Sequence, residues 1–460
     1  MMSFRMQNLK TKSVSSSITH RRILTTALPV TLASATTPLV AAVDTAVIGQ
    51  LGDASLIGGV AAANVLVNFI FFTFNFVRSS TVGMVAQALG AGRPVEGLHV
   101  VVRAATISLI IGALAVLCSR PIAEAGFMLL DIEGDVREAG DAYFHVRVLS
   151  APMLLAHFSV VGWLFGQRRM FEGIALEILL NATNIAATLF FVRSLHLSVE
   201  GAALGTVFAE AMTGIIGLSL VVRAMQTERM ISIGAALRDR EKLLVMVRVN
   251  GDILIRSLLL LGSFAWFTRT SAAFGPTVLA ANVVLMTLFN FSGAVVGGVA
   301  TSAQQIAGEA IGAGDRRAMS RGVQLSLLWG SAAGLLTMVC YLAVRDEFLA
   351  LMSANEIVRA TAREIFWFAA LCGPAGAAAF IFDGVYIGAS WSRSLRNVML
   401  LSVGAFIGLS WALLPLFGNA GLWISFLIFL LMRGVLLWLF LARNSAAGPP
   451  PYPTPVDQAQ

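Results

Sequence analysis

The sequence has 460 residues, of which 57% are hydrophobic and 12% are charged, and its mean hydropathy is +0.81. Because roughly a quarter of the residues in a soluble domain are charged, this composition excludes an ordinary water-soluble globular protein. The formal charge of +7 is spread in short clusters between apolar runs, so we expect no nucleic-acid partner. Cys118, Cys340 and Cys372 lie inside or at the ends of apolar runs, without metal-motif spacing. We therefore expect neither disulfides nor a metal site.

Apolar runs of about twenty residues recur along the whole chain, as in helical membrane proteins. We predict that the polar segment 1–22 is a cytoplasmic tail, because no signal-peptide cleavage region follows it. Six spans are predicted in an N-lobe (23–223), at 23–50, 55–88, 98–119, 140–165, 170–193 and 200–223. After a basic linker at 224–244, six more are predicted in a C-lobe (245–442), at 245–270, 278–310, 322–344, 361–389, 396–417 and 420–442. The proline-rich segment 443–460 is predicted to be a disordered tail.

The distribution of Lys and Arg predicts the orientation, because cytoplasmic loops are enriched in both. Alternate loops are basic, beginning with Arg168 and Arg169, whereas the long loop at 120–138 is acidic. We expect both termini on the cytoplasmic side of the inner (plasma) membrane, with the chain surrounded by membrane lipids. No obligate protein partner is evident from the sequence.

An internal repeat relates the two halves of the chain. Val85-Ala-Gln-Ala-Leu-Gly-Ala-Gly92 returns as Ala307-Gly-Glu-Ala-Ile-Gly-Ala-Gly314, and Ala62-Ala-Asn-Val65 returns as Ala280-Ala-Asn-Val283. In the fourth and tenth spans, three residues recur at one constant offset: Pro152, Gly162 and Gly166 return as Pro374, Gly384 and Gly388. Six spans per half give both halves the same orientation, related by a pseudo-two-fold axis along the membrane normal. Parallel repeats of this kind are a transporter architecture that works by alternating access.

Several motifs carry a family resemblance. They are Val43-Asp-Thr-Ala-Val-Ile-Gly-Gln-Leu-Gly52, Arg78 with Gln87-Ala-Leu-Gly-Ala-Gly92, Phe264-Ala-Trp-Phe-Thr-Arg-Thr-Ser271 and Phe382-Asp-Gly-Val-Tyr-Ile-Gly-Ala389. With these motifs, residues 23 to 442 resemble a multidrug and toxic compound extrusion (MATE) transporter of the DNA-damage-inducible (DinF) branch. The resemblance implies a twelve-helix antiporter that moves organic solutes outward against an inward flow of H⁺ or Na⁺.

The resemblance also implies a coupling site in the N-lobe. In the family the first helix bends at a proline before its acidic residue, and Pro29 precedes Asp44 in this way. That aspartate pairs with an Asn and an Asp on the fifth helix. Asn184 matches the Asn, but Thr188 stands where the Asp is expected. The eighth helix also departs from the pattern, because Gly297 and Gln304 occupy its two usual acid positions.

Asp44 is the only acid in the first apolar run, and a charge in hydrocarbon costs at least a few kcal/mol. We interpret it as a carboxylate that takes a proton from outside and releases it when a cationic solute arrives; the alternative is a helix cap near the outer surface. Asp383 breaks the internal repeat and is interpreted either as a second coupling group or as an ion-pair partner of Arg256. Asp252 and Arg256 are spaced i, i+4 and could neutralise each other on one helix.

The remaining candidates are weaker. Arg78 is interpreted as a structural tie to an acid or to backbone carbonyls, ahead of contact with a solute. Asn68 and Phe71 on the second span are the candidate substrate contacts. Asn side chains also join membrane helices by hydrogen bonds, so a structural role for Asn68 stays open.

The sequence thus predicts a secondary antiporter that exports organic, amphipathic and cationic solutes in exchange for H⁺, without a cofactor. One alternative is Na⁺ coupling, which Thr188 disfavours because a Na⁺ cage needs hard oxygen ligands. Another is a lipid-linked saccharide flippase, which needs several basic residues in its cavity. A membrane enzyme is not expected, because the sequence has no cluster of His, Cys or acids suited to catalysis.

Overall fold

The computed structural model describes residues 18–34, 54–195, 197–227 and 232–446, and every regular element in these ranges is a helix. The first half contains α2 (His20–Ser34), α4 (Ala54–Phe74), α5 (Phe76–Gly90), α6 (Pro94–Leu117), α7 (Ser119–Leu129), α8 (Gly134–Val148), α9 (Ala151–Gly166), α10 (Met170–Leu189), the π-helix η1 (Phe190–Ser194) and α11 (Val199–Thr227). The second half contains α12 (Ile233–Arg238), α13 (Arg240–Ala273), α14 (Pro276–Gly312), α15 (Arg316–Ala343), α16 (Arg345–Met352), α17 (Glu356–Gly388) and α18 (Ser392–Ala446).

Long apolar helices dominate the described chain. Eight are long and apolar enough to cross a membrane, and α8 with α9, bent by 48°, makes a ninth. Within α18 the backbone leaves helical geometry at Gly418, which has a φ of 54°. This break lies between the predicted eleventh and twelfth spans. Glycine suits it because residues that carry a side chain rarely adopt a positive φ. The described helices agree with the predicted all-α polytopic membrane fold of twelve helices in two lobes, of which eight or nine pass this test of length and apolarity.

The helix ends differ from the predicted spans in several places. The predicted linker 224–244 contains α12 and the first turn of α13. Each helix begins with an N-cap: the side chain of Ser232 (α12) or Asp239 (α13) accepts a hydrogen bond from a backbone N–H group in the following turn. Part of the predicted loop 120–138 is the helix α7. At the chain ends, α2 begins within the predicted N-terminal tail and α18 continues to Ala446. Residues 1–17 and 447–460 lie outside the described residues.

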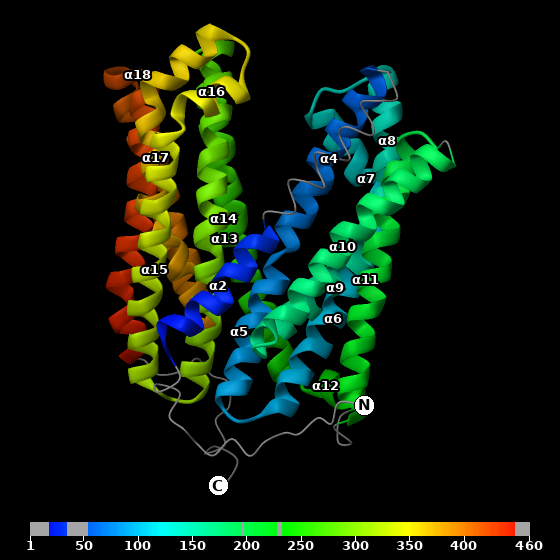
Figure 1. Cartoon of the computed structure of the whole chain (residues 1–460). Coiled ribbons are helices and arrows are strands. Elements are labelled where there is room, and N and C mark those ends of the chain that lie inside the picture. The colour runs from blue at the N-terminus through cyan, green and yellow to red at the C-terminus, as the bar shows by residue number, and fades with distance from the viewer. Residues whose placement is uncertain (1–17, 35–53, 196, 228–231, 447–460) are drawn as a thin grey trace.

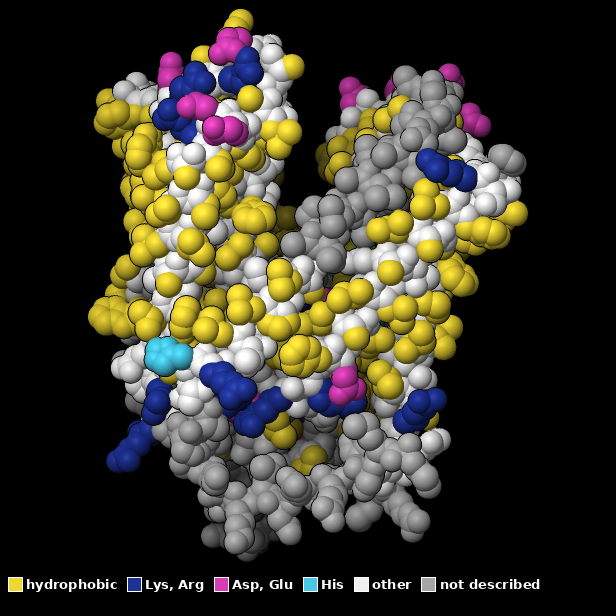
Figure 2. Space-filling model, viewed as in Figure 1, with side chains coloured by type: hydrophobic (Ala, Val, Ile, Leu, Met, Phe, Trp, Pro, Cys, Tyr) yellow, Lys and Arg dark blue, Asp and Glu magenta, His cyan; other side chains and the backbone are white. Residues whose placement is uncertain are grey.

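The two lobes stand side by side and diverge towards one end (Figure 1). They converge at the other end, where α5 contacts both α14 and α17. We call this the closed end, defined by the last residues of α5, α9, α14 and α17, and we call the end with α7 and α16 the open end. The surface between the lobes is hollowed towards the open end (Figure 2). Helix α2 packs on α14 of the C-lobe and also on α10 of the N-lobe, so it crosses the boundary between them.

Glycines of the repeated motif allow α5 and α14 to approach closely at the closed end. A Cβ atom at Gly90 would lie 2.1 Å from the carbonyl oxygen of Glu309, and one at Gly312 would lie 2.0 Å from that of Gln87. Gly90 and Gly312 are equivalent in the repeat, and so are Gln87 and Glu309. The two contacts are therefore related by the pseudo-two-fold symmetry of the lobes. Small residues allow helices to pack in this way inside membranes.

Candidate functional site: polar groups within and between the lobes

A charged lock joins the lobes at the closed end. The carboxylate of Glu309 on α14 has no exposed surface, and it accepts a hydrogen bond of 2.7 Å from Nη2 of Arg22 on α2. It also accepts 2.7 Å from Nε of Arg168, which follows α9, and a second bond from the same guanidinium. These hydrogen bonds raise the pKa of the Arg168 guanidinium, although burial opposes the shift. We call Arg22, Glu309 and Arg168 the inter-lobe lock.

A neutral counterpart of this lock lies across the pseudo-two-fold axis. Gln87, the equivalent of Glu309, donates from Nε2 to the Gly388 carbonyl at 2.8 Å and contacts the Ser390 hydroxyl at 2.9 Å. Ser390 is in turn the equivalent of Arg168, and both have positive φ angles, 56° and 65°. The closed end is thus held by two symmetry-related contacts, of which only one is ionic.

Inside the N-lobe, a small polar cluster joins α10 to α11. Asn184 donates from Nδ2 to the Thr206 hydroxyl at 2.8 Å, and its side chain is 3% exposed. The Oδ1 atom of Asn184 and the hydroxyl of Thr188, which is fully buried, have no hydrogen-bond partner among the described residues. A buried acceptor without a partner is costly, so two such oxygens on one helix indicate a place for a proton donor or a cation.

Of the other two residues implied at this site, only Pro29 is among the described residues. Asp44 lies outside the described residues. Pro29 lies inside α2, and two residues later the Thr31 hydroxyl contacts the Val295 carbonyl of α14 at 3.3 Å. The helix that leads towards Asp44 is therefore anchored to the opposite lobe.

Two arginine–acid pairs link helices within the N-lobe. Arg78 on α5 donates to Glu177 on α10 at 2.7 Å and lies 5.2 Å from the ring centre of Phe165. Arg147 on α8 makes two 2.7 Å bonds to Glu210 on α11. Glu177 and Glu210 did not figure in the sequence analysis, although an acid in a predicted span is a sufficient signal.

The two candidate substrate contacts on α4 differ in their exposure. Phe71 is 8% exposed, and the guanidinium of Arg147 lies over its ring, 4.9 Å from the ring centre. Asn68 is exposed. The guanidinium of Arg147 thus covers one face of the Phe71 ring, and contact of Phe71 or Asn68 with a solute stays a prediction.

In the C-lobe, Asp383 on α17 is held by two arginines. Arg256 on α13 and Arg433 on α18 both donate to its Oδ2 atom, the latter at 2.6 Å. Asp252 does not pair with Arg256 one turn away. Instead it accepts from Arg396 at 2.6 Å and from the Ser392 hydroxyl at 2.8 Å. The i, i+4 spacing was misleading here, because α18 offers a closer cation than the same helix does.

Comparison with known proteins assigns the family. The MatE family model matches residues 29–188 and again 253–412, one match in each half of the chain. The chain is 35% identical to DNA damage-inducible protein F of Escherichia coli (strain K12) over 427 residues, 91% of each protein. The chain belongs to the MATE family. The similarity to this relative places it in the DinF branch.

Solved MATE structures share the fold at low sequence identity. A Vibrio cholerae MATE transporter, VcmN in the bent form, superposes with a TM-score of 0.83 at 17% identity, covering 95% of this chain and 99% of that one. A multidrug resistance MATE family transporter of the MOP superfamily, described as outward-facing, gives a TM-score of 0.82 at 15% identity, covering 93% and 96%. This MATE protein is therefore an integral membrane transporter.

Two positions on α14 where this MATE chain departs from the implied pattern have different surroundings. Gln304 on α14 donates from Nε2 to the Ser79 carbonyl of α5, so it joins the lobes. Among the described residues, a Cβ atom at Gly297 would meet nothing within 4 Å beyond the backbone of its own helix. At the two usual acid positions, the structure thus has a lobe-to-lobe hydrogen bond and an open space.

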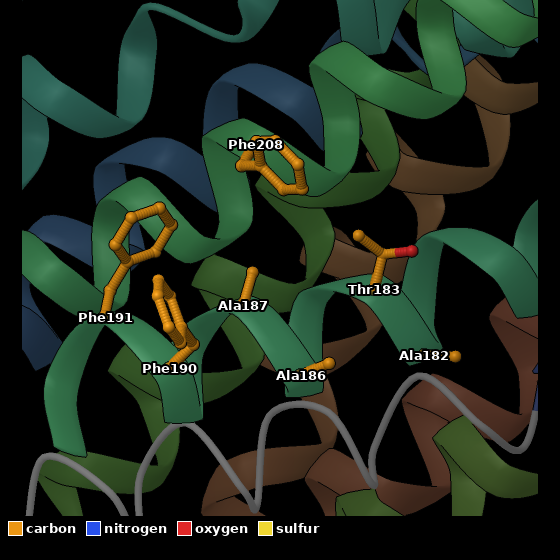
Figure 3. Close-up of a pocket in the computed structure, with 7 residues that line it drawn as sticks. All are labelled: Ala182, Thr183, Ala186, Ala187, Phe190, Phe191 and Phe208. Carbon is orange, nitrogen blue, oxygen red and sulfur yellow. The ribbon is translucent and has the colours of Figure 1, made fainter. Parts of the chain in front are cut away.

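A pocket of about 530 Å³ lies between α10, η1 and α11 of the MATE fold (Figure 3). It is lined by aromatic and small side chains: Ala182, Thr183, Ala186, Ala187, Phe190, Phe191 and Phe208. A π-helix such as η1 frequently marks a functional site. The pocket shares α10 with the Asn184 cluster, so an aromatic surface and unpartnered oxygens lie on adjoining faces of one helix.

Proposed function

We propose that this MATE transporter exports amphipathic organic cations in exchange for inward H⁺, with Asp44 as the coupling carboxylate. The observation that carries the proposal is the aromatic pocket beside the Asn184 cluster. Its volume of about 530 Å³ is within the range of drug-sized ligand sites. Phenylalanine faces attract organic cations, and the unpartnered oxygens of Asn184 and Thr188 can each accept a hydrogen bond from the O–H group of a neutral carboxylic acid.

The pairing of the other acids supports H⁺ coupling through Asp44. Glu177, Glu210 and Asp383 are each held by at least one arginine, and a nearby cation favours the ionised carboxylate. Such groups are poor proton carriers. Thr188 supplies a hydroxyl where an acid would complete a Na⁺ site, and we therefore favour H⁺ over Na⁺.

The orientation of the transport cycle follows from the predicted topology. With both termini in the cytoplasm of a cell bounded by this inner membrane, the closed end faces the cytoplasm and the open end faces outside. The described arrangement then corresponds to an outward-facing state. In it, the coupling group takes up a proton from outside and the solute leaves.

Proton release from the purified protein in detergent tests this proposal. Addition of ethidium to wild type should release protons, with or without Na⁺, because solute and proton compete for one carboxylate. Asp44→Asn should release none, whereas Glu172→Gln should behave like wild type, since the Glu172 side chain is 48% exposed and pairs with Arg169. Equal release from Asp44→Asn and wild type would refute Asp44 as the coupling group.

A further inference from the structure

The buried charges of the C-lobe do not balance. Arg256, Asp383 and Arg433, which we call the Arg–Asp–Arg triad, come from α13, α17 and α18 and meet at one carboxylate oxygen. Their side chains are 14%, 9% and 1% exposed, respectively. Arginine stays protonated in proteins, so an ionised Asp383 leaves the triad with one net positive charge.

No neighbouring acid on these helices offsets that charge. Asp252, one turn from Arg256, is bound to Arg396 and Ser392. The ring of Phe429 lies 5.3 Å from the Arg433 guanidinium, which provides only a weak cation–π contact. An uncompensated charge in a buried site costs several kcal/mol, which makes a missing anionic partner the simplest explanation.

The hydrogen bonds within the triad leave donors available for such a partner. Both guanidiniums donate to Oδ2 of Asp383, while Nη1 of Arg433 and Nε of Arg256 have no acceptor among the described residues. These two N–H groups belong to different helices and flank the same carboxylate. Guanidinium groups recognise carboxylates and similar oxyanions by charge-assisted hydrogen bonds.

We propose that the Arg–Asp–Arg triad binds the carboxylate or sulfonate group of an amphipathic solute that the transporter moves. The inference rests on the proposed export function and extends its substrate class to zwitterions and organic anions. Arg256 provides access, because it is the most exposed member of the triad. Asp383 accepts a hydrogen bond from each guanidinium and lowers the net positive charge of the site.

Two probes with one ring system test the proposal: 2-naphthoate and 2-naphthalenemethanol. Binding to the purified full-length protein is measured by equilibrium dialysis. Wild type should bind 2-naphthoate at least about tenfold more tightly than the alcohol, as expected for a charge-assisted hydrogen bond. Equal affinities would overturn the proposal. Chloride and benzoate are then compared as competitors of 2-naphthoate at equal concentration. If chloride displaces 2-naphthoate to the same extent as benzoate, the proposal is also overturned, because the site would then bind any small anion.

Charge-changing variants make the test specific to the triad. Arg256→Gln should weaken 2-naphthoate binding about tenfold and leave the alcohol unchanged, and Arg256→Lys should restore most of the loss. Asp383→Asn should strengthen 2-naphthoate binding, because it raises the net charge; a merely structural role predicts the opposite sign. If Asp383→Asn does not fold, the comparison of Arg256→Gln with Arg256→Lys tests the proposal instead.

Two further variants separate this proposal from others. Arg396→Gln removes a guanidinium from the neighbouring Asp252 pair and should leave 2-naphthoate binding unchanged. Asp44→Asn should also bind 2-naphthoate normally, so failure of the coupling proposal would not affect this result. Conversely, wild type that releases protons normally but does not prefer 2-naphthoate would overturn the triad proposal alone.

Discussion

Gly312→Ala is expected to abolish transport by preventing the lobes from meeting at the closed end. The added methyl group would lie 2.0 Å from the backbone carbonyl oxygen of Gln87, far inside van der Waals contact. Backbone atoms cannot move aside as a flexible side chain can, so α5 and α14 must separate. Overpacking of a well-packed interior costs about 1–3 kcal/mol, and here separation of the lobes relieves that cost. Ethidium export from reconstituted vesicles measures the effect.

The internal symmetry supplies a second variant, and the C-lobe supplies a control. Gly90→Ala, the equivalent substitution, would place its methyl group 2.1 Å from the Glu309 carbonyl and should give the same loss. Gly404→Ala should leave export unchanged, because a Cβ atom there meets nothing within 4 Å in the described part of the chain beyond its own helix backbone. Normal export by Gly312→Ala would show that the close approach of α5 and α14 is not part of the cycle.

Glu309→Gln is expected to open the closed end without added bulk. It removes the negative charge that joins Arg22 and Arg168 and leaves the two guanidiniums to repel each other. Breaking a buried ion pair costs about 3–5 kcal/mol, and we take the lower value because Arg168 is 45% exposed. At 1.4 kcal/mol per factor of ten, the population with a closed inter-lobe lock should fall roughly 100-fold relative to the open one.

Pulsed electron paramagnetic resonance can measure this shift. Spin labels at Arg223→Cys on α11 and Arg317→Cys on α15 report the separation of the lobes near the closed end, in a protein whose three native cysteines are replaced by alanine. Glu309→Gln should lengthen the main distance, and Glu172→Gln, whose ion pair lies within one lobe, should not. An unchanged distance distribution in Glu309→Gln would mean that the lock does not hold the lobes together.

The fold could be predicted because it depends on features that repeat along the chain. Long apolar runs predict membrane helices whatever their partners are, and the two copies of the Gln87 motif predict two lobes of the same orientation. Helix ends were predicted less well. The short helix α12 lies in a polar segment, where the capping residue Ser232 decides the structure locally.

The charge pairs of the site could not be predicted from local spacing. Asp252 and Arg256 are one turn apart, yet each pairs with a residue more than 100 positions away. Such pairs depend on how helices pack, which the sequence of one helix does not determine. Arg433 was missed although a charge in the last apolar run was visible, because no partner for it lies nearby in the sequence.

The coupling ion is the central claim, and a flux measurement in reconstituted vesicles tests it most directly. Ethidium movement is followed under a pH gradient without Na⁺, and separately under a Na⁺ gradient at equal pH, for wild type and Asp44→Asn. We predict that the pH gradient alone drives ethidium in wild type, with protons moving in the opposite direction, and that Asp44→Asn is inactive under both gradients. Movement driven by the Na⁺ gradient alone, or by the pH gradient in Asp44→Asn, would contradict proton-coupled export through Asp44.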